Sequence, residues 1–269
     1  MLQFPCSSKE SVFYQNRKDI TPLSKRKTVL ITGSSQGIGR ASALALSGPD
    51  KNIVINYHTH REEAEKTALL CREKGAQTLV LGCDIGDFES CKKLHEIIQS
   101  KFLGVDILVN NAGVSVFGQI QDMTPEQWRQ VFRVNVDGVF YNTKLSIPHM
   151  IEQKWGRIIN ISSIWGLVGG SCESLYSASK GAVLAFTKAC AKELGPSQIT
   201  CNAIAPGNVE TGMLGMLDPE TRKGLAEETP IERLLKPEEI ALWIVHLADE
   251  NAGAMTGQVI SPNGGWVIY

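Results

Sequence analysis

The sequence predicts an α/β fold, a single doubly wound domain with a seven-stranded, mostly parallel sheet and helices on both faces. From Lys27 onward, short runs rich in β-branched residues alternate with longer segments of helical periodicity, which is the pattern of consecutive βαβ units. Hydrophobic residues make up 43% and charged residues 20% of the 269 residues, as in globular domains. No Pro/Gly/Ser-rich linker and no internal repeat interrupts the alternation, so one domain is expected over 27–269.

The elements follow in order along the chain. Right-handed crossovers between parallel strands place helices on both faces and open a ligand crevice at the carboxyl ends of the strands. The helical periodicity is clearest at 38–46, 62–74 and 182–194. The expected strands are 28–31, 53–56, 78–81, 106–109, 157–161, 200–204 and 258–260.

Residues 1–26 form an N-terminal extension that lacks the periodicity of the rest. We expect a partly ordered arm on the surface. The extension has no apolar segment of a secretory signal, and Glu10 and Asp19 count against a transit peptide, although organellar targeting remains open.

The seven cysteines are scattered without metal-ligand spacing, so no metal site and a reducing cytoplasm are expected. Cys172 falls in a candidate active-site segment, where an inert small residue is the preferred interpretation.

The charge balance excludes several classes of partner. Lys and Arg total 27 against 28 Asp and Glu, a net charge of -1, so no global field attracts nucleic acid or an anionic membrane surface. No run approaches the roughly 18 to 20 apolar residues of a membrane-spanning helix. Neither a nucleic-acid partner nor a membrane partner is expected.

A glycine-rich turn follows the first strand and opens the first helix. Its absent Cβ atoms let backbone amides approach a pyrophosphate at the helix N-terminus. The glycine spacing differs from the G-x-G-x-x-G fingerprint, but the position after the first strand indicates a dinucleotide site. The residues expected to contact the cofactor here are Gly33, Ser35, Gln36, Gly37, Ile38 and Gly39.

The end of the second strand favours NADP(H) over NAD(H). A carboxylate at this position would bind the ribose of NAD and repel a 2′-phosphate, and the segment 56–61 contains none. Ser35, Asn56, His58 and Arg61 are therefore candidate phosphate contacts. The alternative is that Arg61 merely begins the next helix, and NAD(H) stays possible.

Two further groups suggest chemistry at the same sheet edge. Asp84 and the segment 110–113 are polar turns after the third and fourth strands, each compatible with ordinary loop chemistry. Tyr176 and Lys180 lie four residues apart, on one face of a helix if the segment is helical. A cation near a phenol favours the phenolate, so Tyr176 could exchange a proton near neutral pH.

Together these motifs resemble the short-chain dehydrogenase/reductase family over essentially all of 27–269, which implies a Rossmann-type fold. The motifs that carry the resemblance are 32–39, 110–113, Asn135, Ser163, Tyr176, Lys180 and 206–207.

The resemblance implies a role for each matching residue. Tyr176 is the general acid to a carbonyl oxygen, Ser163 orients that oxygen, Lys180 holds the nicotinamide ribose and lowers the pKa of the tyrosine, and Asn135 anchors a water in the proton relay. These four are the expected catalytic residues. Further cofactor contacts are expected at Asp84, Asn111, Ala112, Gly113, Tyr176, Lys180, Pro206, Gly207 and Thr211.

Within the family, the segments 156–163, 202–207 and 263–265 look most like the 3-oxoacyl-(acyl-carrier-protein) reductases. This implies NADPH-dependent reduction of a 3-oxoacyl thioester to a secondary alcohol in fatty acid biosynthesis, with an acyl carrier protein as partner and a homotetramer as assembly. The segment 162–173 also looks similar to reductases of a ketone on a protein-attached modification. An alcohol or sugar dehydrogenase is a further alternative.

The match weakens before the tyrosine, where Glu173 replaces the usual Gln. A carboxylate facing the pocket would repel anions and favour a cationic ketone, but a solvent-facing Glu173 is an equal alternative.

The segment 208–230, with Met213 as a substrate contact, is interpreted as a mobile lid, although core packing explains its methionines as well. The apolar C-terminus, 266–269, suits either a subunit contact or the chain's own core.

Two classes of protein compete with the reductase interpretation. A nucleotide-binding sensor would keep the glycine turn and discard the proton-transfer residues, which are intact here. A serine hydrolase built on Ser163 lacks a histidine nearby in the sequence, although one could approach in space.

Overall fold

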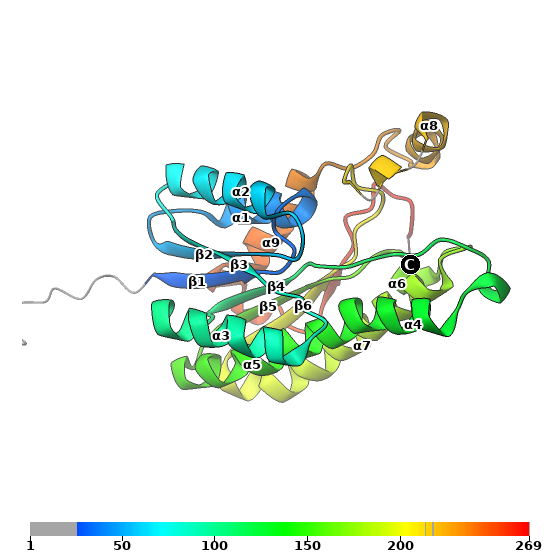
Figure 1. Cartoon of the computed structure of the whole chain (residues 1–269). Coiled ribbons are helices and arrows are strands. Elements are labelled where there is room, and N and C mark those ends of the chain that lie inside the picture. Colours follow the sequence, from blue (N-terminus) through cyan, green and yellow to red (C-terminus); the bar gives the residue numbers. More distant parts are fainter. Residues whose placement is uncertain (1–25, 213, 217, 269) are drawn as a thin grey trace, which may run out of the picture.

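The computed structural model describes residues 26–212, 214–216 and 218–268, and it confirms the seven-stranded sheet (Figure 1). Every neighbouring pair of strands is parallel, in the order β3-β2-β1-β4-β5-β6-β7. The strands are β1 (Lys27–Ile31), β2 (Lys51–Tyr57), β3 (Gln77–Gly82), β4 (Ile107–Asn110), β5 (Gly156–Ile161), β6 (Ile199–Ile204) and β7 (Val259–Ile260).

Helices cover both faces of the sheet (Figure 1). One face carries α1 (Gly37–Leu46), α2 (Arg61–Glu73) and α9 (Pro237–Ala248), and the other carries α3 (Phe88–Phe102), α5 (Gly138–Gln153) and α7 (Ser174–Leu194). Between α4 (Pro125–Phe132) and α5 lies a π-helical turn, η2 (Arg133–Asp137). The short α6 (Trp165–Val168) and α8 (Pro219–Glu228) lie beyond the carboxyl ends of the strands.

Each face has its own apolar core, because successive side chains of a strand point to opposite sides. In β1, Val29 and Ile31 pack in the cluster under α1, α2 and α9, whereas Leu30 packs in the cluster under α3, α5 and α7. All three are fully buried. Burying a side chain of this size contributes about 1.5–3 kcal/mol, so the central strands are fixed from both sides.

The strand order reverses between β1 and β4, and this reversal positions the site. From β1 the chain builds outward to β2 and β3 on one side, and from β4 it builds outward on the other. The loops that leave β1 and β4 therefore diverge and open a crevice between them. Both the glycine turn and the segment 110–113 begin at this crevice.

Several predicted boundaries shift by a few residues. The helix predicted from Ala182 begins at Ser174, so Tyr176 and Lys180 do lie in one helix. The N-terminal extension, apart from Arg26, lies outside the described residues, as does Met213. Among the described residues, no helix combines the length and apolar character needed to cross a bilayer.

Candidate active site

A cavity of about 520 Å³ lies at the carboxyl ends of the strands and brings together most of the predicted site residues. Its walls come from the loops after β1 to β6 and from the start of α7. Three predicted residues, Gly39, Arg61 and Asn135, do not line it. The predicted residues that do are Gly33, Ser35, Gln36, Gly37, Ile38, Asn56, His58, Asp84, Asn111, Ala112, Gly113, Ser163, Glu173, Tyr176, Lys180, Pro206, Gly207 and Thr211.

The glycine turn packs so closely against its neighbours that side chains do not fit. Gly33 has φ +61°, and a Cβ there would lie 3.0 Å from the Cα of Ala112. A Cβ on Gly39 would overlap the Gly33 carbonyl oxygen and lie 2.6 Å from Asn111 Nδ2. Gly39 therefore packs against the turn itself and not against the cavity, which explains why it does not line the cavity.

Hydrogen bonds fasten the turn to the loop that leaves β4. Thr32 Oγ1 accepts from the backbone amides of Asn111 (2.9 Å) and Ala112 (3.1 Å). In return, Asn111 Nδ2 donates to the carbonyls of Thr32 (2.9 Å) and Gly33 (3.0 Å). The side chain of Asn111 thus supports the cofactor turn. Thr32 opens the motif 32–39, but its role in fastening the turn to the β4 loop was not predicted.

Asn56 has a supporting role where a phosphate contact was expected. Its Oδ1 accepts from the Gly33 amide at 3.0 Å, and its Nδ2 donates to the carbonyls of Leu81 (3.4 Å) and Cys83 (3.2 Å). Arg61 is exposed at the first position of α2, which matches the alternative stated for it. Ser35 and His58 line the cavity, as Asn56 does, and their role as phosphate contacts stays a prediction.

Asp84 lines the cavity near His58 as a neutralised charge. Arg133 Nη1 lies 2.7 Å from its carboxylate, and the Gly86 amide donates to it at 3.0 Å. Burial raises the pKa of Asp84, but these two hydrogen bonds outweigh burial and hold the pKa below its usual value. Asp84 is therefore ionised and paired.

At the other end of the cavity lie Ser163, Tyr176 and Lys180. Ser163 follows β5, and its hydroxyl hydrogen-bonds the phenol of Tyr176. Lys180 Nζ donates to the carbonyl of Ile161 at 2.8 Å and lies 5.5 Å from the centre of the Tyr176 ring. A substrate oxygen could therefore contact both the Tyr176 phenol and the Ser163 hydroxyl, with the Lys180 ammonium nearby.

The pKa of Tyr176 moves opposite to the expected direction. Burial raises it, the nearby charge of Glu173 raises it further, and the hydrogen bond with Ser163 offsets only a part. Lys180 does not lower it here, because its ammonium contacts Ile161 and not the phenol oxygen. In this structure the phenol therefore holds its proton at neutral pH.

Asn135 does not line the cavity but hydrogen-bonds residues that form its wall or adjoin it. Its Oδ1 accepts from the Val114 amide (2.8 Å), and its Nδ2 donates to the Val114 carbonyl (2.9 Å) and to Ser179 Oγ (3.0 Å). The side chain thereby ties the loop after β4 to α7. It lies in η2, and single π-helical turns are frequent at functional sites.

Glu173 faces the cavity, which decides between the two alternatives for it. Only 9% of the residue is exposed, and Ser115 Oγ donates to its carboxylate at 3.3 Å. Burial raises the pKa of Glu173, and hydrogen bonds from Ser115 and Trp165 partly offset this effect. Sequence reasoning missed both partners, since Ser115 lies in the loop after β4 and Trp165 begins α6.

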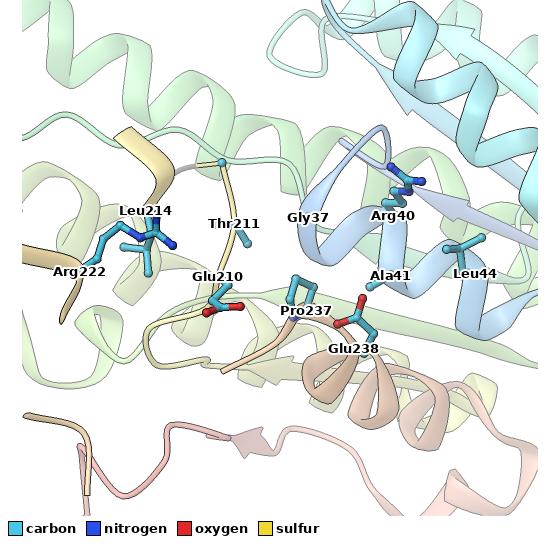
Figure 2. A pocket seen from close by; sticks show the side chains of 11 residues that line it. Gly37, Arg40, Ala41, Leu44, Glu210, Thr211, Leu214, Arg222, Pro237 and Glu238 are labelled. Atoms are coloured by element: carbon cyan, nitrogen blue, oxygen red, sulfur yellow. The ribbon is translucent and has the colours of Figure 1, made fainter. Parts of the chain in front are cut away.

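The segment after β6 forms one wall of the cavity, called its roof below. The roof residues are Pro206, Gly207, Asn208, Val209, Thr211, Gly212 and Leu214. Behind the roof lies a second cavity of about 550 Å³, which Figure 2 shows between α1 and α9. Thr211 and Leu214 belong to the walls of both cavities, and α8 buries none of its residues. With space on both sides and little packing, the roof is suited to move as the predicted lid. Met213 itself lies outside the described residues.

The residues of the cavity fit a dinucleotide. The glycine turn leaves room for a pyrophosphate where a Cβ would intrude, at the N-terminus of the ten-residue helix α1. Near the catalytic end, Asn208 Nδ2 is buried without a hydrogen-bond partner in the protein. An unpaired buried donor beside a cavity calls for an acceptor on a ligand, and a carboxamide would provide one.

The comparisons with known proteins agree with this geometry. The profile of the family described as short chain dehydrogenase matches residues 27–222. The chain belongs to the short-chain dehydrogenase family. This establishes an NAD(P)-dependent oxidoreductase and confirms the Rossmann-type fold.

Curated relatives cover nearly the whole of this dehydrogenase. An uncharacterized oxidoreductase, YmfI, of Bacillus subtilis (strain 168) is 39% identical over 89% of this chain and 98% of its own. The 3-oxoacyl-(acyl-carrier-protein) reductases FabG of Aquifex aeolicus (strain VF5) and Staphylococcus aureus (strain Mu50 / ATCC 700699) are 38% and 35% identical over 89% of this chain. The matches cover 96% and 97% of those two reductases.

We predict that Gly39→Ala damages both folding and cofactor binding. The new methyl group would meet backbone atoms of Gly33 and Ser34, which cannot move without breaking the turn. We expect the free energy of unfolding to fall by about 1–3 kcal/mol in urea titration, with weaker NADPH binding. Gly224→Ala is the control, because nothing lies near its Cβ and alanine favours the helix by about 1 kcal/mol. Equal stability of both variants would contradict this account.

We predict that Lys180→Met stabilises the cofactor-free protein at neutral pH. Burial lowers the pKa of Lys180 from 10.5 to about 8, so the buried ammonium costs about 3 kcal/mol, less about 1 kcal/mol for the lost bond to Ile161. Between pH 8 and 10.5 the unfolded chain holds more protons than the folded one, so wild type gains stability as the pH rises and the advantage of the variant shrinks. Unfolding titrations across this range measure it, with the exposed Lys188→Met on the same helix as control. An advantage that does not change with pH would refute the assignment.

Proposed function

We propose that this dehydrogenase reduces a ketone to a secondary alcohol with NADPH. The observation that carries the proposal is the junction, in one cavity, of the glycine turn with Ser163, Tyr176 and Lys180. The bound nicotinamide supplies the hydride to the carbonyl carbon. The phenol of Tyr176 gives its proton to the carbonyl oxygen, so that C=O becomes CH–OH.

The other residues hold the reacting groups. The Ser163 hydroxyl donates to the carbonyl oxygen and fixes its direction, which stabilises the developing negative charge. The Lys180 ammonium, held by Ile161, binds the ribose hydroxyls next to Tyr176. Asn135 keeps the loop after β4 in place against α7, and our earlier assignment of a relay water to it stays a prediction.

The first candidate substrate is a 3-oxoacyl thioester carried by an acyl carrier protein. Its support comes from the two FabG relatives, which are 3-oxoacyl-(acyl-carrier-protein) reductases, and from their coverage of this chain. The second candidate is a ketone that carries a positive charge. The buried carboxyl of Glu173 in the cavity wall favours it.

We further propose a homotetramer in a reducing cytoplasm. Exposed apolar side chains occur on two separate surfaces, with Trp128 and Phe140 on α4 and α5, and Leu242 and Trp243 on α9. Paired surfaces of this kind suit an assembly with two kinds of contact. The described cysteines are free thiols, which suits a reducing compartment.

The preference for NADPH predicts the effect of one substitution. No acid occurs among the cavity residues 56–60, so nothing there repels a 2′-phosphate. We expect a lower KM for NADPH than for NADH. His58→Asp would introduce the missing repulsion and raise the KM for NADPH at least about tenfold. NADH kinetics on the same variant serve as control, since its free ribose hydroxyl tolerates the acid. A lower KM for NADH in wild type would overturn the preference.

The proton donor is tested by Tyr176→Phe with acetoacetyl thioester as substrate. We expect wild type to oxidise NADPH with this substrate, and the variant to lose at least about a hundredfold in kcat while still binding NADPH. Tyr141→Phe, which removes a phenol outside the cavity, is the control. Near-normal turnover by Tyr176→Phe would exclude the mechanism. Absence of turnover in wild type would exclude the thioester.

A further inference from the structure

Glu173 occupies the N-cap of α7 without capping it. An acidic N-cap residue normally accepts a hydrogen bond from the amide two or three residues on, which stabilises the helix. Asp87 and Asp218 do this for α3 and α8. The carboxylate of Glu173 makes no such bond, although α7 has 21 residues. Its side chain is part of the cavity wall instead.

The surroundings of this carboxyl group contain donors but no cation. Ser115 Oγ donates to it at 3.3 Å, and Trp165 donates through its indole. By contrast, Asp84 in the cavity wall pairs with Arg133, and Glu239 at the start of α9 pairs with Arg233. Within the described part of the chain, no positive charge acts on Glu173 in this way.

A buried carboxylate without a counter-ion is unfavourable, so a partner outside the chain would stabilise it. Ser115 and Trp165 both donate hydrogen bonds to the Glu173 carboxylate. The carboxylate itself can only accept hydrogen bonds, so a ligand that binds it has to supply a donor. A bound cation would complete it. An anionic or purely apolar ligand would leave the charge unpaired.

The position of Glu173 relative to Tyr176 limits where that cation can be. The two residues lie three apart in the chain at the start of α7, and their charges interact. Neighbours at this spacing on a helix have Cβ atoms about 5–6 Å apart. A ketone whose oxygen meets Tyr176 therefore brings the adjoining part of its carbon chain to Glu173.

We propose that Glu173 is a specificity-determining residue that binds an ammonium group of the substrate, a short distance from the ketone that is reduced. This rests on the proposed ketone reduction. The carboxylate accepts hydrogen bonds from the ammonium and supplies the opposite charge, while Ser115 and Trp165 hold it in place. The enzyme accordingly prefers amino ketones over neutral ketones of the same length.

The preference is measured with a matched pair of ketones. One is a methyl ketone with a dimethylammonium group three carbons from the carbonyl carbon, which cannot cyclise to an imine, and the other has an isopropyl group in place of the dimethylammonium. We expect wild type to favour the amino ketone at least about tenfold in kcat/KM, and Glu173→Gln to bring the ratio close to one. Glu193→Gln, an exposed change on the same helix, should keep the wild-type ratio.

A binding measurement separates this inference from the proposed reaction. We expect n-propylammonium to bind wild type loaded with NADPH in calorimetry, and to bind Glu173→Gln at least about tenfold more weakly, with NADPH binding as the check that the variant folds. Equal kcat/KM for both ketones in wild type, or an unchanged ratio in Glu173→Gln, would overturn the inference alone. If wild type reduces neither ketone, the reaction proposed for these substrates fails, and propylammonium binding decides on the Glu173 site by itself.

Discussion

The site depends on the hydrogen bonds that join the ends of β1 and β4. These strands are adjacent in the sheet, but the chain leaves them in opposite directions, so nothing in the sheet itself fixes their loops. The side chains of Thr32 and Asn111 supply the connection through four hydrogen bonds, two between these residues and one each with Ala112 and Gly33. The glycine turn can then approach the β4 loop to van der Waals distance, which leaves the backbone as the floor of the cavity.

The catalytic end is built from titratable groups held out of water, and this has a cost in stability. Lys180 and Glu173 are both buried, with the pKa of each displaced toward the neutral form. The two apolar cores on either side of the sheet contribute the stability that offsets this cost. Such local destabilisation is expected where groups must be ready for charge changes in a reaction.

The sequence predicted the architecture because hydrophobic periodicity and the order of turns are local signals. Seven strands, their parallel arrangement and the helix that carries Tyr176 and Lys180 all follow from patterns within a few residues. The motifs also identified the family. The roles of Asn56 and Asp84 could not be predicted in the same way. Asn56 binds the glycine turn and Asp84 pairs with Arg133, and both contacts join residues far apart in the chain.

The same limit applies to electrostatics. Proximity of Lys180 to Tyr176 in the helix suggested a lowered phenol pKa, but the direction depends on burial and on Glu173, which sequence spacing does not describe. Whether Glu173 faced solvent or the cavity was also undecidable from residue type. Its orientation follows from the placement of Ser115 and Trp165, which the fold brings to it from the loop after β4 and from the start of α6.

The π-helical turn η2 sets the rotational phase between α4 and α5. A wider turn accommodates one more residue than an α-helical turn of the same rise. Deleting a single residue there would rotate α4 about 100° around its axis relative to α5. The stacked Trp128 and Phe132 would then leave their present side of the molecule. This segment should therefore tolerate exchanges of side chain far better than changes of length.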